Sequence, residues 1–266
     1  MNAVATVLDD VRAQGRSALI AYYPVGYPSV EASCRAITTM VESGADIIEV
    51  GVPYSDPVLD GPVIQLAAEH ALRAGARIAD VFHGVKAAVS AGAPAVVMTY
   101  YNPILQYGLD RFARDLAQAG GSGVILPDLT PDVAQEWLTV AGQYGLATTF
   151  LVAPSSTQER IHMTVSATTG FIYAASLMGV TGERATVGSQ AERLVRDTRA
   201  AGARHVCVGL GVSTGDQAAD VARYADGVIV GSAFVRCVTD NPDEATAFAA
   251  LRAKAQELAH GVRSHL

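Results

Sequence analysis

The sequence predicts an α/β protein with one domain, a (β/α)8 TIM barrel that spans residues 1–266. Eight short apolar segments recur along the chain, and helix-length segments with apolar residues three and four positions apart separate them. No linker, low-complexity stretch or block of charge divides the chain. Because a single barrel of this kind typically takes about 250 residues, we expect closure into a barrel and not an open doubly wound sheet.

The apolar segments have the continuous hydrophobicity of strands that are buried on both faces of a parallel sheet. The expected strands are 18–23, 46–50, 95–100, 123–126, 148–152, 171–174, 205–209 and 227–230. Expected helices between them include 30–43, 109–119, 131–144 and 191–201. Ser29, Thr130-Pro131 and Ser156-Thr157 are typical of helix starts.

Composition narrows the class of protein. Half of the residues are hydrophobic and 17% are charged, which suits a compact enzyme with a large core. A net charge of -7 and a pI near 5.3 disfavour nucleic acid and anionic membranes as partners. The first 15 residues lack the apolar core of a secretion signal, and no apolar run is long enough to span a bilayer, so we expect a cytoplasmic protein. The dispersed Cys34, Cys207 and Cys237 predict reduced thiols and no metal site.

Two carboxylates near the second expected strand form the strongest functional signal. Glu49 closes an apolar strand, where low polarity favours its neutral form, and a protein tolerates that cost mainly where the carboxylate has chemistry to perform. Asp60 follows in a loop stiffened by prolines. Two carboxyl groups in unlike surroundings suit one proton-donating and one charge-holding role. The alternatives are a buried structural ion pair for Glu49 and a turn residue for Asp60.

Further polar residues stand at other strand ends. In a barrel the active site lies at the C-terminal ends of the strands, which places Glu49 at the same mouth as Tyr100, Asn102, Asp128 and Tyr173. Asp128 is as well explained as a cap of the following segment. The tyrosines and Asn102 also fit packing or loop-bracing roles, which we expect for Tyr22, Tyr23 and Tyr101.

Glycine-containing turns after the last two strands predict a phosphate site. They are 208–213, with Gly211, and 230–233, with Gly231 and Ser232. Barrels often bind phosphate with backbone amides at this place, and glycine lets the backbone approach the anion. The polar segment 179–190 is either a closing lid or an ordinary exposed loop.

Several mechanisms are excluded on residue type. Schiff-base aldolases need a lysine inside the barrel, but Lys86 and Lys254 both fall in expected outer helices. The histidines are too dispersed to form a metal site, and no Gly-x-Ser-x-Gly elbow is present. Acid/base chemistry by carboxylates, without a metal ion, remains.

Together these motifs resemble the tryptophan synthase alpha-subunit family. The signature is Glu49-Val50-Gly51-Val52-Pro53-Tyr54-Ser55-Asp56-Pro57, followed by 60–62 and Gln65. The resemblance continues through 98–104, 127–129, 179–182, 209–211 and 231–232, so it spans nearly the whole chain.

The resemblance implies a retro-aldol cleavage of indole-3-glycerol phosphate to indole and glyceraldehyde 3-phosphate in L-tryptophan biosynthesis. It implies that Glu49 protonates the indole ring at C3 and takes the glyceryl hydroxyl proton, while Asp60 accepts the indole N–H. The remaining matches are Tyr173 beside the substrate, Gly182, Gly211 and Ser232 at the phosphate, and Thr181 on the lid. No cofactor is implied for this chain, because pyridoxal phosphate belongs to a partner beta subunit in an expected alpha2beta2 assembly.

Departures from the family pattern occur at Tyr27, Val63, Leu177 and Met178. They bear on rate and on coupling to the partner more than on the reaction class. Two other functions stay open: a free-standing indole-3-glycerol-phosphate lyase, and a non-catalytic barrel that regulates a pyridoxal-phosphate-dependent partner. Intact Glu49 and Asp60 count against the second.

Overall fold

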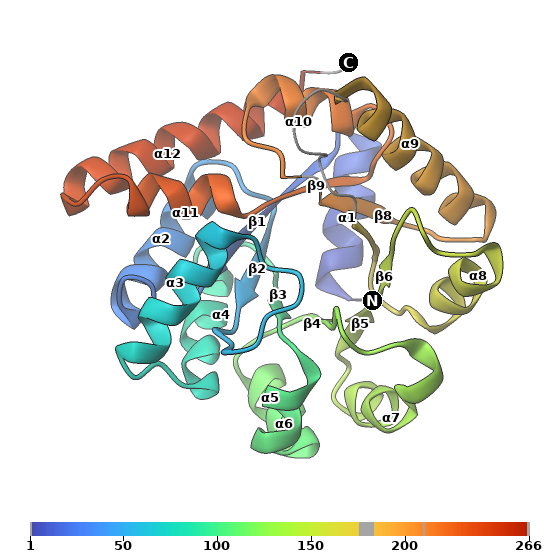
Figure 1. Cartoon of the computed structure of the whole chain (residues 1–266), viewed down its shortest axis with the longest axis horizontal. Helices are drawn as coiled ribbons and strands as arrows, with labels where there is room; N and C mark the ends of the chain where they lie inside the picture. The colour runs from blue at the N-terminus through green and yellow to red at the C-terminus, as the bar shows by residue number, and fades with distance from the viewer. Residues whose placement is uncertain (1, 176–183, 210, 265–266) are drawn as a thin grey trace.

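A ring of helices surrounds a barrel of parallel strands (Figure 1). The structure, a computed structural model, describes residues 2–175, 184–209 and 211–264. Its strands are β1 (Ala18–Pro24), β2 (Ile47–Gly51), β3 (Ala95–Met98), β4 (Gly123–Ile125), β5 (Ala147–Thr149), β6 (Leu151–Val152), β7 (Ile172–Ala175), β8 (Val206–Gly209) and β9 (Gly227–Val230). Neighbours follow the order β5-β4-β3-β2-β1-β9-β8-β7-β6, which confirms the predicted barrel.

The barrel has one more strand than expected because the fifth predicted strand is divided at Phe150. On one side the Thr149 carbonyl accepts the Leu126 amide, and on the other the Phe150 carbonyl accepts the Tyr173 amide. One short segment therefore joins β4 to β7 and brings the two ends of the sheet together.

Helices cover the outside of the barrel. They are α2 (Val30–Glu42), α3 (Pro62–Arg73), α4 (Val81–Ser90), α5 (Tyr101–Tyr107), α6 (Leu109–Gln118), α7 (Gln135–Gln143), α8 (Gln158–Ala167), α9 (Arg184–Ala200), α10 (Gly215–Ala222), α11 (Ser232–Thr239) and α12 (Glu244–Gly261), with 3-10 turns η1 (Ile78–Asp80) and η2 (Pro131–Val133). Ser29 and Thr157 cap α2 and α8 through their side chains, as predicted, whereas Thr130 caps η2 without a side-chain bond.

Two expected helix starts were wrong. The helix expected over 131–144 begins at Gln135, because residues 131–133 form the separate 3-10 turn η2. The helix expected over 191–201 begins at Arg184, so residues 184–190 of the segment considered as a lid or loop are helical. The earlier part of that segment, with Leu177, Met178, Thr181 and Gly182, lies outside the described residues.

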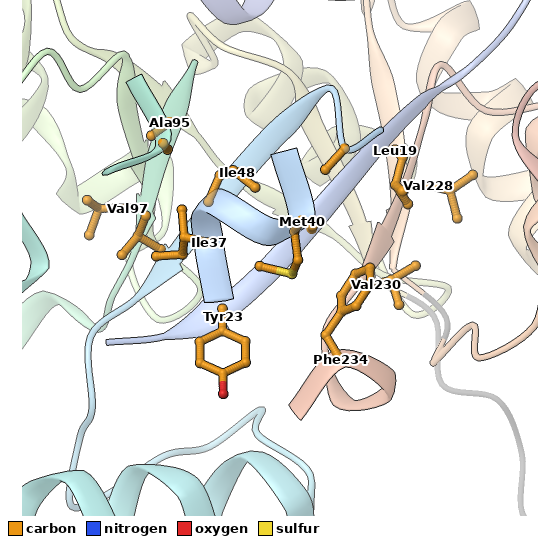
Figure 2. Close-up of a cluster of buried hydrophobic side chains, with 14 of the residues drawn as sticks. Leu19, Tyr23, Ile37, Met40, Ile48, Ala95, Val97, Val228, Val230 and Phe234 are labelled. Atoms are coloured by element: carbon orange, nitrogen blue, oxygen red, sulfur yellow. The ribbon is translucent and has the colours of Figure 1, made fainter. Parts of the chain in front are cut away.

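An outer core fills the space between the strands and the helices. Figure 2 shows part of it, where Ile37 and Met40 of α2 and Phe234 of α11 lie among strand side chains such as Leu19 and Ile48. All five are fully buried. This layer accounts for the continuous hydrophobicity of the strands, because their outward faces are as buried from solvent as their inward faces.

A second core fills the interior of the barrel. Its residues from the strands are Ala18, Ile20, Ile47, Val96, Ile125, Cys207 and Ile229, joined by Phe171 directly before β7. Helix α1 (Ala3–Ala13) adds Val4, Leu8 and Val11 to this layer and so closes the N-terminal end of the barrel. The opposite end of the barrel, where the strands end, is therefore the place for an active site.

Candidate active site

Glu49 lies inside the barrel, directly above this apolar layer. It is two residues after the inward-facing Ile47 on β2, and successive even steps along a strand share a face. Its side chain is 2% exposed, and its Oε2 has no hydrogen-bond partner among the described residues. Burial, with a smaller contribution from the charge of Asp60, raises the pKa of Glu49 from 4.5 to about 8.

Comparison with the other buried acid indicates that Glu49 is not a structural ion pair. Among the described residues, two acidic side chains are buried, Glu49 and Asp226. Asp226 is paired with Arg12 and Arg199 and accepts the Val206 amide, so its charge is compensated. Glu49 forms no such pair in the described part of the chain.

Asp60 stands on the loop between β2 and α3, and its backbone is held on both sides. The hydroxyl of Tyr100 accepts the amides of Val58 and Leu59 at 3.0 and 3.1 Å, and Nε2 of Gln65 donates to the Asp60 carbonyl at 2.7 Å. Burial raises the pKa of the Asp60 carboxyl from 3.8 to about 6. The carboxylate itself has no hydrogen-bond donor among the described residues, which leaves it free to accept one from a ligand.

The two pKa values divide the roles of the carboxyl groups at neutral pH. With a pKa of about 8, Glu49 is mainly protonated and can act as an acid. With a pKa of about 6, Asp60 is mainly ionised and can stabilise positive charge. Opposite protonation states in neighbouring carboxyl groups are the pattern expected of an acid/base site.

Two tyrosines flank Glu49 at the mouth. Tyr22 pairs with Glu49 in the β1–β2 register, and its ring lies against Gly51, where a side chain would clash with it. Tyr173 of β7 lies in the same way against Gly209 of β8. Burial, followed by the nearby carboxylates, raises the pKa of both phenols, so they stay protonated as hydrogen-bond donors.

Tyr22 is a site residue that the sequence reasoning missed, since it was assigned to packing. The same assignment is confirmed for Tyr23, which points outward into the core and is fully buried. The alternation of side chains along β1 distinguishes the two tyrosines. Tyr22 follows the inward-facing Ile20 by two residues, so it points into the barrel.

The remaining predicted mouth residues contact Tyr54, Tyr101 and the backbone of the Asp60 loop. Tyr54 stacks on Tyr100 with ring centroids 5.1 Å apart and receives a 3.3 Å hydrogen bond from Nδ2 of Asn102. Both carboxylate oxygens of Asp128 accept the Tyr101 amide, at 3.0 and 3.1 Å. Asp128 therefore caps α5, not the segment that follows it, and any contact of Tyr100, Asn102 or Asp128 with a substrate stays a prediction.

The predicted phosphate residues lie at the ends of β8 and β9. Gly211 has a φ of 68°, a conformation that favours glycine, and it is exposed. Gly231 directly precedes α11, and Ser232 is the first residue of that helix. First-turn amides have no intrahelical acceptor and attract anions, so the geometry can hold a phosphate. Thr181 and Gly182 lie outside the described residues.

Of the family departures that the structure describes, Tyr27 packs edge-on against His70 of α3, with ring centroids 5.3 Å apart, and Val63 lies in the first turn of α3. Lys86 and Lys254 are on the outer helices α4 and α12. Within the described residues no cluster of three or more His, Cys, Asp or Glu side chains could hold a metal ion. None of the helices described there is long and apolar enough to cross a membrane.

Comparison with known proteins identifies relatives along the full length of the chain. The family model described as "Tryptophan synthase alpha chain" matches residues 8–263. Tryptophan synthase alpha chains from Streptomyces avermitilis and Thermobifida fusca are 56% and 54% identical, covering 98% and 99% of this chain and 94% and 99% of theirs. A crystal structure of tryptophan synthase from M. tuberculosis in an aminoacrylate-bound form contains a chain that is 52% identical, with a TM-score of 0.90 and coverage of 99% of this chain and 100% of that one.

Proposed function

This chain belongs to the tryptophan synthase alpha chain family, and we propose that Glu49 and Asp60 carry out the family's reaction. The chain is a carbon–carbon lyase of tryptophan biosynthesis, which cleaves indole-3-glycerol phosphate to indole and glyceraldehyde 3-phosphate. The observation that supports our assignment best is the unpaired, mainly protonated Glu49 at the top of the apolar barrel interior, with the mainly ionised Asp60 nearby.

The proposed reaction uses Glu49 twice, first to donate one proton and then to accept a different one. Protonated Glu49 gives its proton to C3 of the indole ring, and the positive charge that develops on the ring is stabilised by Asp60, which accepts the indole N–H. The Glu49 carboxylate then takes the proton of the adjacent glyceryl hydroxyl. The carbon–carbon bond breaks, its electrons return to the indole ring, and the hydroxyl carbon becomes the aldehyde of glyceraldehyde 3-phosphate. Glu49 ends as it began, protonated.

The remaining predicted residues bind and orient the substrate in this proposal. The start of α11 with Gly231 and Ser232, and the exposed backbone of Gly211, receive the phosphate, together with Thr181 and Gly182. Tyr173 lies beside the indole. Phosphate binding at β8 and β9 and acid/base groups at β2 would place the indole across the barrel axis, above the apolar layer. The chemistry needs no cofactor in this chain, and we assign pyridoxal phosphate to the partner.

Glu49→Gln tests the assignment. We expect at least about a hundredfold loss of cleavage, the scale of a general acid/base, with unchanged affinity for an indole-alkyl phosphate in calorimetric titration. Glu69→Gln is the matched control, because Glu69 is exposed on α3 and, within the described part of the chain, its ion pair is with Arg73 on the same helix. Near-normal turnover by folded Glu49→Gln protein would refute the assignment.

We further propose a beta subunit as the partner, in an alpha2beta2 assembly. Large apolar side chains are exposed near the loops that follow β2, β3 and β4: Val58, Leu59, Leu66, Leu105 and Val133. Contiguous exposed apolar patches mark interaction surfaces, and Val58 and Leu59 are adjacent in the chain. Val58 is 72% exposed and lies two residues before Asp60, so a partner that covers it would contact the catalytic loop.

The partner proposal is tested with the cognate beta subunit. Val58→Lys should weaken the complex in titration, whereas Val89→Lys, an exposed position on α4, should not. The beta subunit should also raise the cleavage rate. No complex, together with full activity of the isolated chain, would favour the free-standing lyase instead. The expected cytoplasmic location and the single domain over 1–266 stay predictions.

A further inference from the structure

We propose that Tyr100 is a positioning residue, whose hydroxyl fixes the loop that presents Asp60 to the substrate. The proposal rests on the function proposed above for Asp60, and it assigns Tyr100 a role different from direct substrate binding. Its basis is a set of hydrogen bonds that joins the loops after β2, β3 and β4.

The hydroxyl of Tyr100 is already occupied on its acceptor side. It accepts two consecutive backbone amides, those of Val58 and Leu59, at 3.0 and 3.1 Å. Two bonds to successive residues fix both the position and the rotation of the backbone immediately before Asp60. The Tyr100 side chain is itself 4% exposed, so it can hold this position firmly.

The segment held in this way has little other support. Residues 52–61 contain no helix or strand, and the side chains of Val58 and Leu59 are 72% and 51% exposed. Neither amide has a backbone acceptor among the described residues. The bonds to Tyr100, and the bond from Gln65 to the Asp60 carbonyl, therefore determine where this carboxylate lies.

Tyr100 is anchored in turn from the loop after β4, and its ring packs on the loop that it holds. The adjacent Tyr101 amide is held by the Asp128 carboxylate from the loop after β4, and the Tyr100 ring lies against Tyr54 of the loop that carries Asp60. In this way a continuous chain of contacts runs from Asp128 through Tyr100 to the backbone of Asp60, across the loops that follow three neighbouring strands. A side chain that acts at the end of such a series affects catalysis through geometry, and displacements on the order of 1 Å can cost a hundredfold in rate.

The test is Tyr100→Phe, which removes the hydroxyl and keeps the stacked ring. We expect kcat to fall roughly tenfold or more with a smaller change in KM, because a misplaced Asp60 fails mainly as charge develops in the transition state. Tyr107→Phe is the matched control: it removes a part-buried hydroxyl of α5 that bonds Asp115, outside the site. We expect its kcat to be unchanged.

A double-mutant cycle separates positioning from direct contact. In an Asp60→Asn background, Tyr100→Phe should cost less than about twofold, because the group it positions has already lost its charge. If the two losses multiply instead, Tyr100 acts on the substrate directly and the proposal is wrong.

Amide hydrogen exchange supplies a readout that does not depend on activity. Tyr100→Phe should speed exchange of the Val58 and Leu59 amides by about tenfold or more, since both lose their acceptor. Unchanged exchange would overturn the proposal. If the wild-type protein failed to cleave the substrate, the function proposed for Asp60 would fall, and exchange at these two amides would still decide whether Tyr100 holds the loop.

Discussion

Replacing Glu49 with Gln should stabilise the folded protein at alkaline pH and have little effect at acid pH. Burial raises the pKa of Glu49 from 4.5 to about 8, so the folded protein retains a proton that the unfolded chain releases. Between these two values the folded state binds more protons than the unfolded state, and the free energy of unfolding falls as the pH rises. Gln is neutral and nearly the same size, so the variant escapes this loss.

The magnitude follows from the two pKa values. One pKa unit corresponds to about 1.4 kcal/mol. Between about pH 5 and about pH 9, the difference in unfolding free energy between variant and wild type should therefore grow by about 4 kcal/mol in favour of Glu49→Gln. Taking this difference cancels the titration of groups that behave alike in the two proteins.

Urea unfolding of both proteins at the two pH values measures it. Glu69→Gln, on the exposed face of α3, serves as the control whose difference from wild type should stay nearly constant. A Glu49→Gln difference that does not change with pH would mean that Glu49 ionises as readily in the folded protein as in the unfolded chain. Such a carboxylate would not be available as an acid at neutral pH, and the reasoning about its role would fail.

Three other substitutions have defined outcomes. Asp60→Asn should lower kcat strongly with a smaller loss of substrate affinity, because the carboxylate helps most as positive charge develops; reduced affinity with unchanged kcat would make it a ground-state binding group. Gly211→Asp should abolish most of the affinity for an indole-alkyl phosphate in calorimetry, because the added charge repels phosphate; the barrel should stay folded at some cost from the φ of 68°, because no described atom lies within 4 Å of a Cβ placed there. Gly51→Ala should push the Tyr22 ring into the mouth and lower kcat/KM by about tenfold, whereas Gly142→Ala, with open space around it, should not; equal effects would contradict the packing argument.

The sequence predicted the barrel and its buried acid for physical reasons that are local. Strand hydrophobicity reflects burial on both faces, and a carboxylate such as Glu49 stands out because its surroundings are apolar. Burial of both faces also removes the alternation of apolar and polar residues, so the sequence does not indicate which face of a strand points inward. Tyr22 and Tyr23 therefore looked equivalent, although one lies at the mouth and the other in the outer core.

Tertiary contacts limit the prediction in a different way. The bond between Tyr100 and Leu59 joins residues 41 positions apart, and no local pattern indicates it. The division of the fifth strand at Phe150 likewise depends on which neighbours supply donors to its carbonyls. The start of α9 at Arg184 was missed because polar and glycine-containing residues in its first turns resemble a loop.

The apolar layer inside the barrel, which α1 closes at its N-terminal end, affects how the proton of Glu49 exchanges with solvent. Beneath Glu49 lie aliphatic and aromatic side chains and the Cys207 thiol, whose pKa burial raises well above its usual value. Among the buried side chains described in this layer, the thiol is the one group that carries an exchangeable proton, and it stays protonated, so the layer offers Glu49 no proton relay toward α1. The mouth is therefore its route to bulk water. A ligand seated across the mouth cuts that route and isolates the acid from solvent. The hydrogen taken from the glyceryl hydroxyl would then stay on Glu49 until the products depart. The hydrogen isotope that one turnover delivers to C3 of indole would be the one that Glu49 acquired from the solvent before the ligand entered.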